Sequence, residues 1–409
     1  MNDTGINTRA DWQGEGTLSQ LSGELRARQA SRIDCTVDPR QLLVNVANTG
    51  ELLLASVPGT QASEFISTEG VIIRDKAVTQ LCTRMNPDVP ARFGKSLATM
   101  RPNIAVDMFN SLISQDDYSK SRRWFVRQLR GQVRAILSDR YLAIDDEDLM
   151  FTALQELQNH GGWVMSAQLT DDNMRMSYCC PSLGRLLDSP ARGDGSFFDA
   201  GSMANPQWLN RMGINEKSWP DQFKMLKDAN GNMVLPGGEI GNSETGNGSA
   251  YVRFKTYDSI CFNGCTLETV HHMRHLGEKL EPGIWQADTI THNHQLRKKM
   301  IGDAVTATFD QDRVNTWINR RVAASHDVLS PTAAVDNVAT LCTLSEDERD
   351  ELLTVFCRDY VSTREGLSQA AARVAQDATN PDKASEWQSH AATIIVARSG
   401  VTNGALITA

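Results

Sequence analysis

The sequence predicts an α+β protein, in which an antiparallel sheet built from β-hairpins is covered by helices and followed by a mostly helical C-terminal subdomain. Paired apolar runs with short turns between them lie in the first half of the chain, and helical periodicity fills most of the last third. A chain of 409 residues is long enough for two or three ordinary domains. We expect divisions at 1–64, 65–285 and 286–409, with an N-terminal helix and hairpin, an α+β core and an acidic helical subdomain.

The N-terminal elements follow from leucine spacing and turn residues. Leucines three and four residues apart predict an amphipathic helix over 17–32. The apolar runs 42–46 and 52–54 flank an Asn-Thr-Gly turn, which is typical of a β-hairpin. Helices are expected over 76–86 and 96–114, because the prolines between them break the helical pattern.

The middle of the chain changes to strand patterns. Hairpins are expected over 124–137 and 163–178, and a strand over 251–262. Residues 188–249 are rich in Gly, Pro, Asn and Asp and have little periodicity, so we expect a long irregular region of the kind that often carries function. From about residue 266 the pattern predicts helices almost to the end. These helical segments are 267–280, 289–324, 345–376 and 383–398.

Composition limits the class of protein. With 40% hydrophobic and 22% charged residues, the chain has a globular composition and not a disordered or fibrous one. It lacks an apolar run of about 18 residues and a secretory start, so we expect a cytoplasmic protein without membrane contacts. Eight cysteines do not suggest a disulfide scaffold. The net charge is −9, and 15 acidic against 9 basic residues give segment 303–409 a net charge of −6.

The segment 120–140 reverses this acidic character. It holds seven basic residues and one acidic residue, a net charge of +6. A helix would align its arginines in a stripe, but the Arg130-Gly131 turn and the β-branched and aromatic residues favour a hairpin. In that hairpin Arg127 and Arg134 are expected directly opposite each other. The core side is then expected to hold Trp124, Val126, Val133, Ala135 and Leu137.

Arginines that face each other across a sheet repel, and an anion between them would relieve that repulsion. The phosphates of a nucleic acid are one candidate; the alternative is a solvated face whose arginines pair with carboxylates of this chain. Tyr141 or Trp124 would stack bases. The residues expected at a nucleic-acid interface are Lys120, Arg122, Arg123, Arg127, Arg130, Arg134, Arg140 and Tyr141.

Four short motifs carry a family resemblance. They are the segments 134–141 (RAILSDRY), 242–246 (NSETG), 261–264 (CFNG) and 274–277 (RHLG). In this order they resemble the phage/plasmid-like family called domain of unknown function 932, over roughly residues 65–280. The motif residues are Ser138, Asp139, Asn242, Ser243, Glu244, Gly246, Cys261, Asn263, Gly264 and His275.

The resemblance implies a gene carried by a phage, plasmid or prophage in a bacterial host, and it supplies no established activity. A basic hairpin on a mobile element is similar to the ring-forming single-strand annealing proteins, which implies a homo-oligomer. The leading hypothesis is therefore a non-enzymatic protein that binds or anneals single-stranded DNA in recombination or replication. A second hypothesis is a protein-binding inhibitor of a host defence system, whose acidic helices mimic the charge of DNA.

Metal chemistry gives a further alternative. Asp139, Glu244 and His275 lie in separate motifs, and together they would hold Mg²⁺ or Mn²⁺ for phosphodiester cleavage. Cys261 and Cys265 precede three histidines at 271, 272 and 275, but their spacing fits no strong zinc template. We therefore expect no cofactor, and a divalent metal only if the protein is a nuclease.

Overall fold

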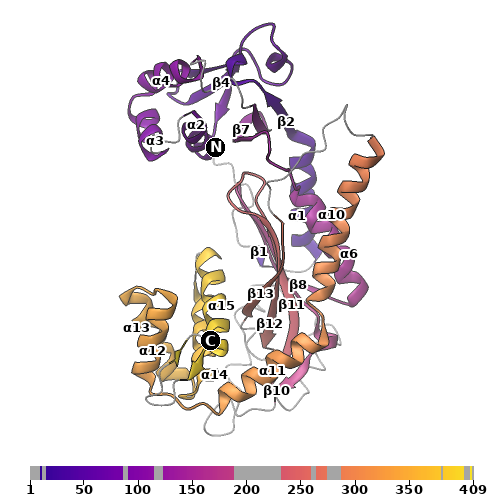
Figure 1. Cartoon of the computed structure of the whole chain (residues 1–409), viewed down its shortest axis with the longest axis vertical. Coiled ribbons are helices and arrows are strands. Elements are labelled where there is room, and N and C mark those ends of the chain that lie inside the picture. Colours follow the sequence, from indigo (N-terminus) through magenta and orange to yellow (C-terminus); the bar gives the residue numbers. More distant parts are fainter. Residues whose placement is uncertain are drawn as a thin grey trace.

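Two sheets organise the chain along its long axis (Figure 1). The structure is a computed structural model that describes residues 10–11, 15–85, 91–114, 123–187, 232–258, 264–273, 287–378, 381–399 and 406–407. Among these residues the upper sheet has the strand order β2-β6-β7-β5-β4-β3, and the lower sheet the order β1-β8-β9-β11-β12-β13, with β10 paired to β11. The combination of antiparallel sheets, helices and a helical C-terminal region is the predicted α+β class.

Residues 32–138 form what we call the upper lobe. Its strands are β2 (Arg32–Val37), β3 (Leu42–Val46), β4 (Leu52–Ser56), β5 (Val71–Ile73), β6 (Trp124–Leu129) and β7 (Gln132–Ser138). The predicted hairpin at 42–54 is confirmed as β3 and β4. β2 pairs with β6, so a single sheet joins residues on both sides of position 65. β5 and β7 run parallel, unlike the other pairs of this sheet.

Helices α2 (Asp75–Met85), α3 (Ala91–Met100) and α4 (Pro102–Ser114) cover one face of the upper sheet. Their apolar residues pack on Val44, Val126 and Ile136 of the strands. The segment expected as one helix over 96–114 is helical but divided, because α3 ends at Met100 and Pro102 starts α4.

The β6–β7 hairpin is confirmed, and its turn residues Arg130 and Gly131 both have positive φ, as a two-residue type I′ turn requires. Its predicted register is wrong. Arg127 pairs with Ala135 and Gln128 with Val133, so a β-bulge at Arg134 shifts the alternation.

The bulge changes which side chains share a face. Trp124, Val126, Val133 and Ile136 face the helices of the upper lobe. Ala135 and Leu137, which were expected beside them, lie on the other face with Phe125 and Tyr141. The two arginines are therefore not direct cross-strand partners.

The lower sheet and the helices on it form what we call the lower body. Its strands are β1 (Ala10–Asp11), β8 (Trp163–Leu169), β9 (Met174–Cys179), β10 (Arg185–Leu187), β11 (Asn232–Asn242), β12 (Ala250–Asp258) and β13 (Gly264–Met273). The hairpin predicted over 163–178 is confirmed as β8 and β9. Two expectations are wrong: part of the expected irregular region 188–249 is the central strand β11, and part of the expected helix 267–280 is the edge strand β13. The predicted strand over 251–262 is present as β12 up to Asp258.

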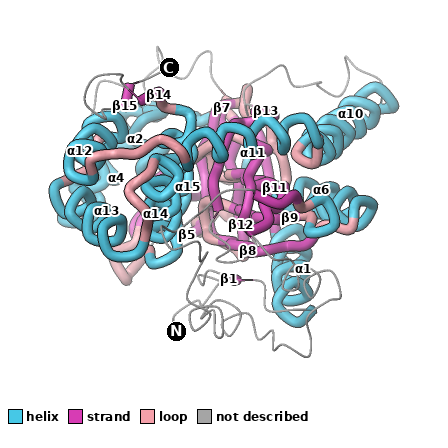
Figure 2. The backbone as a smooth tube through the Cα atoms, turned by 90° about the horizontal axis from the view of Figure 1, so that it is seen from below, coloured by secondary structure: helices cyan, strands magenta, loops and turns pink. Residues whose placement is uncertain are grey.

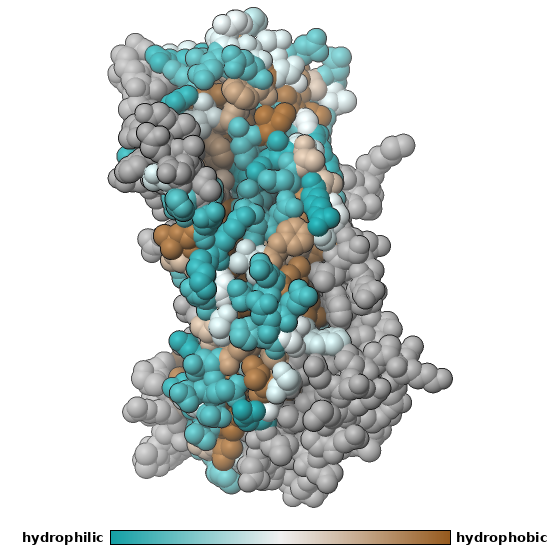
Figure 3. All heavy atoms as spheres, turned by 90° about the vertical axis from the view of Figure 1, so that its right-hand side faces the viewer, coloured by the Kyte–Doolittle hydropathy of each residue, from teal (hydrophilic) through white to brown (hydrophobic). Residues whose placement is uncertain are grey.

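One face of the lower sheet is covered by α1 (Glu15–Ser31), α6 (Asp146–His160) and α10 (Ala287–Ala307). Met176, Ile240 and Val252 of the sheet pack there against apolar residues of the helices. The solvent side of these helices is mainly hydrophilic, as Figure 3 shows from this side of the molecule. The covering helices α1 and α6 flank the upper lobe in sequence. Arg32, where the chain leaves α1, donates to Asp145, just before α6, at 3.0 Å.

The remaining helices gather on the other side of the lower sheet (Figure 2). They are α11 (Gln311–Ser325), α12 (Pro331–Cys342), α13 (Glu346–Asp359), α14 (Arg364–Asp377) and α15 (Pro381–Val396), with a small pair β14 (Arg398–Ser399) and β15 (Leu406–Ile407). Buried Arg321 of α11 joins Asp258 at the end of β12 to Glu365 of α14. Within the part of the chain that the structure describes, no helix is both long and apolar enough to cross a membrane.

Candidate functional site

Arg127, the first of the two central hairpin arginines, is fully buried. Its Nε and Nη2 donate to the two carboxylate oxygens of Asp34 at 3.0 Å each, and its Nη1 donates to the carbonyl oxygen of Glu244 at 3.0 Å. Nη2 also lies 3.3 Å from Asp145 Oδ1. Burial alone would lower the pKa of Arg127, but the surrounding carboxylates outweigh it and raise the pKa. This guanidinium is therefore permanently charged and already surrounded by acceptors of the same chain.

Arg134, with 2% of its surface exposed, is bound in the same way. Its Nη1 donates to Glu244 Oε2 at 2.9 Å and its Nη2 to the carbonyl oxygen of Asp171 at 2.9 Å. The other oxygen of Glu244, Oε1, accepts from the backbone N–H of Asp146 at 2.9 Å. Burial would raise the pKa of Glu244, but Arg127 and Arg134 outweigh it and lower the pKa. The two arginines expected to bind phosphate pair with carboxylates instead, which corrects the sequence-based placement of the interface.

The other expected interface residues divide into two groups. Tyr141 is buried and its hydroxyl donates to the carbonyl oxygen of Ser243 at 2.8 Å, and Trp124 is buried in the upper lobe, so the expectation that they stack bases is also wrong. Arg123, Arg130 and Arg140 are exposed. Arg130 pairs with Glu24 at 2.6 Å, and Arg123 donates to the carbonyl oxygen of Thr36 at 2.9 Å. Lys120 and Arg122 lie outside the described residues.

Two of the family motifs meet at the junction between the upper lobe and the lower body. Asn242, Ser243 and Glu244 lie at the end of β11 and in the turn before β12, against the segment that contains Ser138, Asp139 and Tyr141. Gly246 has a φ of +75°, and a Cβ there would lie 2.7 Å from Leu137 Cδ2. The contacts of these motif residues therefore hold two parts of the chain together. Of the other motif residues, Gly264 begins β13, while Cys261, Asn263 and His275 lie outside the described residues.

A carboxyl group with a strongly shifted pKa lies in this junction. Asp146 is buried at the start of α6, and Asn242 Nδ2 donates to its Oδ1 at 2.7 Å. Burial and the nearby carboxylate of Glu244 raise the pKa of Asp146 to about 8. Two carboxyl groups close together in a buried site share one negative charge. Asp146 is the member that holds the proton at neutral pH.

The geometry gives little support to a metal site. Both carboxylate oxygens of Glu244 already accept hydrogen bonds, so a metal at Glu244 would displace the buried Arg134 or the backbone N–H of Asp146. Cys265, His271 and His272 lie on strand β13 and not on the helix expected over 267–280, so they do not share a helical face. In the described part of the chain no three His, Cys, Asp or Glu side chains are grouped to hold an ion.

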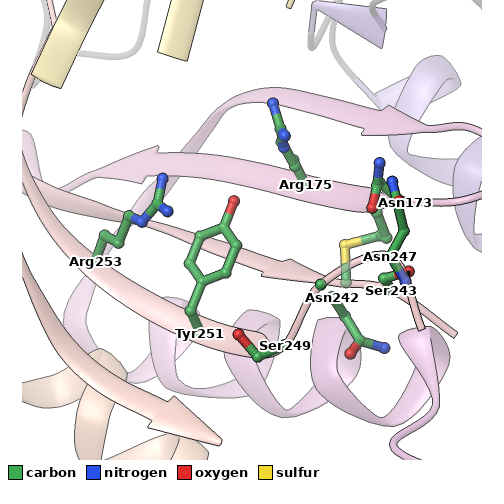
Figure 4. Close-up of a pocket in the computed structure, with 10 residues that line it drawn as sticks. Asn173, Arg175, Asn242, Ser243, Asn247, Ser249, Tyr251 and Arg253 are labelled. Atoms are coloured by element: carbon green, nitrogen blue, oxygen red, sulfur yellow. Dashed lines mark hydrogen bonds between the residues drawn. The ribbon is translucent and has the colours of Figure 1, made fainter. Parts of the chain in front are cut away.

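A second group of arginines lies on the lower sheet, on the face opposite α6 and α10. On this face Arg175 of β9, Gly241 of β11 and Tyr251 of β12 follow one another across the strands. The next row holds Ser177, Glu239 and Arg253 in the same order. A pocket of about 350 Å³ opens here (Figure 4). The residues around it include Asn173, Arg175, Asn247, Ser249, Tyr251 and Arg253.

A buried ion pair lies beside the pocket. Lys255 Nζ lies 2.5 Å from Glu239 Oε2, and both side chains are buried. Burial would raise the pKa of Glu239, but Lys255, Arg253 and Arg175 outweigh it and hold the pKa at about 2. Burial lowers the pKa of Lys255. The 2.5 Å contact keeps both partners charged, so Glu239 is a carboxylate throughout the physiological pH range.

The pocket face combines cationic, aromatic and amide groups. Guanidinium groups bind phosphate through paired N–H donors, and an aromatic ring offers a stacking surface. Asparagine and serine side chains supply both donors and acceptors. This set of groups suits a ligand with a phosphate, a flat ring and a polar ring edge.

Searches with the sequence and the structure give no relative from which to transfer a function. No protein-family model matches the chain, and neither the curated proteins nor the solved structures contain a match. The family resemblance drawn from the four motifs therefore stays a prediction, and the site must be judged on its own geometry.

Sequence reasoning missed the pocket residues, although a signal was present. Tyr251, Arg253 and Lys255 alternate with apolar residues in a segment that was predicted as a strand. Alternation places them on one face of the sheet. Arg175 has the same relation to Met174 and Met176 in the hairpin 163–178. The missing information was that β9 and β12 both lie beside the unpredicted strand β11.

Proposed function

We propose that the protein binds a single strand of nucleic acid on the pocket face of the lower sheet, without catalysing a reaction on it. The observation that carries this proposal is the placement of Arg175, Tyr251 and Arg253 on one sheet face around an open pocket. The proposed class of function is the one expected from the sequence, but the proposed interface lies on β9 and β12 and not on the β6–β7 hairpin.

The charge of the pocket face supports a polyanionic ligand. On this face Arg175, Arg253 and Lys255 surround the carboxylate of Glu239. Lys76 of α2 adds a cation at the rim, where its Nζ donates to Asn247 Oδ1 at 2.6 Å. These four cationic groups around one carboxylate leave an excess of positive charge there, on an otherwise acidic chain. Phosphate groups are attracted to such a face through electrostatics that do not depend on sequence.

The biological setting belongs to the same proposal. We place the protein in the cytoplasm of a bacterial host, encoded by a phage or plasmid, where it binds or anneals single-stranded DNA during recombination or replication. It acts there as a homo-oligomer. The acidic C-terminal helices repel the strand and so confine it to the pocket face.

The test is a double substitution, Arg175→Ala with Arg253→Ala. We expect the affinity for a labelled single-stranded oligonucleotide to fall by about tenfold or more at low salt, because two phosphate contacts are lost. The slope of log K against log salt should become shallower by about 1.4, since each contact to a single strand contributes about 0.7. Fluorescence anisotropy over a salt series measures both quantities.

The matched control is the pair Arg123→Ala with Arg140→Ala, two exposed arginines of the segment that the sequence favoured. These substitutions should leave the affinity and the salt slope unchanged. Loss of binding in the control pair and not in the pocket pair would contradict the proposal. Incubation of the same strands with Mn²⁺ tests the nuclease alternative, because cleavage that Glu244→Gln abolishes would favour it.

A further inference from the structure

The Tyr251 ring is held in place by its neighbours in the lower sheet. Tyr251 lies opposite Gly241 of β11, and a Cβ at Gly241 would lie 2.4 Å from the Cζ and hydroxyl oxygen of the tyrosine. Glycine therefore leaves the space that the ring occupies. The hydroxyl donates to Glu239 Oε1 at 3.0 Å. A ring fixed in this way loses little conformational entropy when a ligand binds to it.

Arg253 lies two residues beyond Tyr251 on the same face of β12. Its Cζ is 4.1 Å from the ring centroid, within the distance of a cation–π contact. In Figure 4 Arg253 lies on one side of the ring, while Ser249, Asn247 and Asn173 lie on the other. The ring therefore lies between Arg253 and these polar side chains, all of which line the pocket.

The opposite wall of the pocket is polar and is anchored by neighbouring groups. Asn247 N–H donates to Ser243 Oγ at 2.9 Å, and Lys76 Nζ donates to Asn247 Oδ1 at 2.6 Å. Ser249 Oγ lies 2.6 Å from His272 Nε2. Side-chain amides such as those of Asn173 and Asn247 match the donors and acceptors on the edges of nucleobases.

We propose that this pocket takes one unpaired base of the bound strand, stacked on Tyr251 with its edge toward Asn173 and Asn247. A base in a duplex offers only its edges, because both of its faces are stacked, so the pocket selects single strands. Arg175 and Arg253 then hold the phosphates that flank the inserted base. This inference rests on the proposed function, since it assigns the ligand of the same site.

The experiment compares two labelled single strands of equal length and phosphate number, one with normal bases and one in which every base is replaced by an abasic tetrahydrofuran unit. The intact protein should bind the base-bearing strand about tenfold or more tightly than the abasic strand. Tyr251→Leu should remove this preference and leave the affinity for the abasic strand unchanged. Tyr251→Phe, which keeps the ring, should retain the preference. A duplex of the same sequence should bind no better than the abasic strand.

Two results would overturn the base pocket. One is equal affinity of the intact protein for the two strands, and the other is a Tyr251→Leu variant that weakens binding of both strands by the same factor and so keeps the preference for the base-bearing strand. In both cases salt-dependent binding of the abasic strand would leave the proposed function standing, whereas no binding of either strand would remove that as well. A 2-aminopurine base in the strand gives a readout that needs no variant. Its fluorescence should fall on binding if the base stacks, and an unchanged signal would count against the pocket.

Discussion

The β6–β7 hairpin and the β9–β12 face carry the same kind of side chain in opposite surroundings. Arg127 and Arg134 of the hairpin are buried and bonded to Asp34 and Glu244, which come from distant parts of the chain. Arg175 and Arg253 of the lower sheet line an open pocket. The hairpin has the denser charge in the sequence, and the sheet face has the geometry of a binding site.

This contrast shows that the density of charge along a sequence does not predict its exposure. A buried arginine is tolerated where carboxylates reach it, and those carboxylates lie 93 and 110 residues away in the chain. Arg175 and Arg253 are only partly buried at the pocket, although Arg253 also lies 3.7 Å from Glu239 and 4.1 Å from the centroid of the Tyr251 ring. Arg127 and Arg134 are therefore expected to matter for stability, and Arg175 and Arg253 for binding.

The largest expected effect concerns the hairpin. Arg127→Met should lower the free energy of unfolding by about 3 kcal/mol, because it removes the buried cation from Asp34 and Asp145 and leaves them only the partly exposed Arg32. Urea denaturation followed by circular dichroism measures this loss. Strand binding, measured where the variant is still folded, should be unchanged. A stability loss below about 1 kcal/mol together with weaker binding would reverse the comparison and return the interface to the hairpin.

The next effect is a pH dependence of stability that should be seen for Asp146 at the junction and not for Glu239 on the pocket face. Folding raises the pKa of Asp146 to about 8, so the folded state holds an extra proton between about pH 4 and 8. Its contribution to stability is complete at low pH and is lost as the pH rises through that range, by up to about 1.4 kcal/mol per pH unit. The side chain of Asp146→Asn stays neutral. The Tm of this variant relative to the unmodified protein should therefore rise as the pH is raised from 6 to 8.

Glu239→Gln is the matched control from the pocket face. The pKa of Glu239 is about 2, so its contribution is lost only as the pH falls through the range from about 4.5 to 2. The Tm difference between this variant and the unmodified protein should be constant from pH 6 to 8. Scanning calorimetry at pH 6 and pH 8 measures the Tm difference of each variant from the unmodified protein. If the difference for Asp146→Asn were also the same at the two pH values, Asp146 would be ionised in the folded protein.

The smallest effect is expected at the exposed tip of the hairpin. Arg130→Asn removes an exposed ion pair with Glu24 and creates the Asn-Gly pair that a type I′ turn favours. These changes oppose each other, so the free energy of unfolding should change by less than about 0.5 kcal/mol. The affinity for a single strand should also stay the same. A clear drop in affinity would mean that the hairpin tip contacts the strand.

Local patterns predicted much of the fold. The hairpins at 42–54, 124–137 and 163–178 were predictable because turn residues and apolar runs lie next to each other in the sequence. Strand β11 was not, since it contains Pro236 and glycines at positions that normally weaken a strand. Those glycines have a tertiary reason: Cβ atoms at Gly238 and Gly241 would overlap the rings of Tyr178 and Tyr251. The glycines of β11 can therefore be explained only when the strands that pair with β11 are known.

The candidate site was predicted less well, and one residue explains part of the error. The bulge at Arg134 shifts half of the hairpin by one position, which exchanges the two faces of β7 beyond it. Nothing in the local sequence marks this extra residue. The burial of Arg127 could not be predicted either, because its partners Asp34, Asp145 and Glu244 are contributed by three separate segments.

The ion pair between Arg32 and Asp145 has a topological consequence. It joins the two points at which the chain passes into and out of the upper lobe, while α1 and α6 on either side pack together in the lower body. The upper lobe is therefore an inserted module whose two ends lie side by side. Neighbouring ends are the geometric condition for transplanting a module or permuting a chain. Such an exchange would also have to keep the contacts of Arg127 and Lys76 with the turn between β11 and β12, which forms one wall of the pocket.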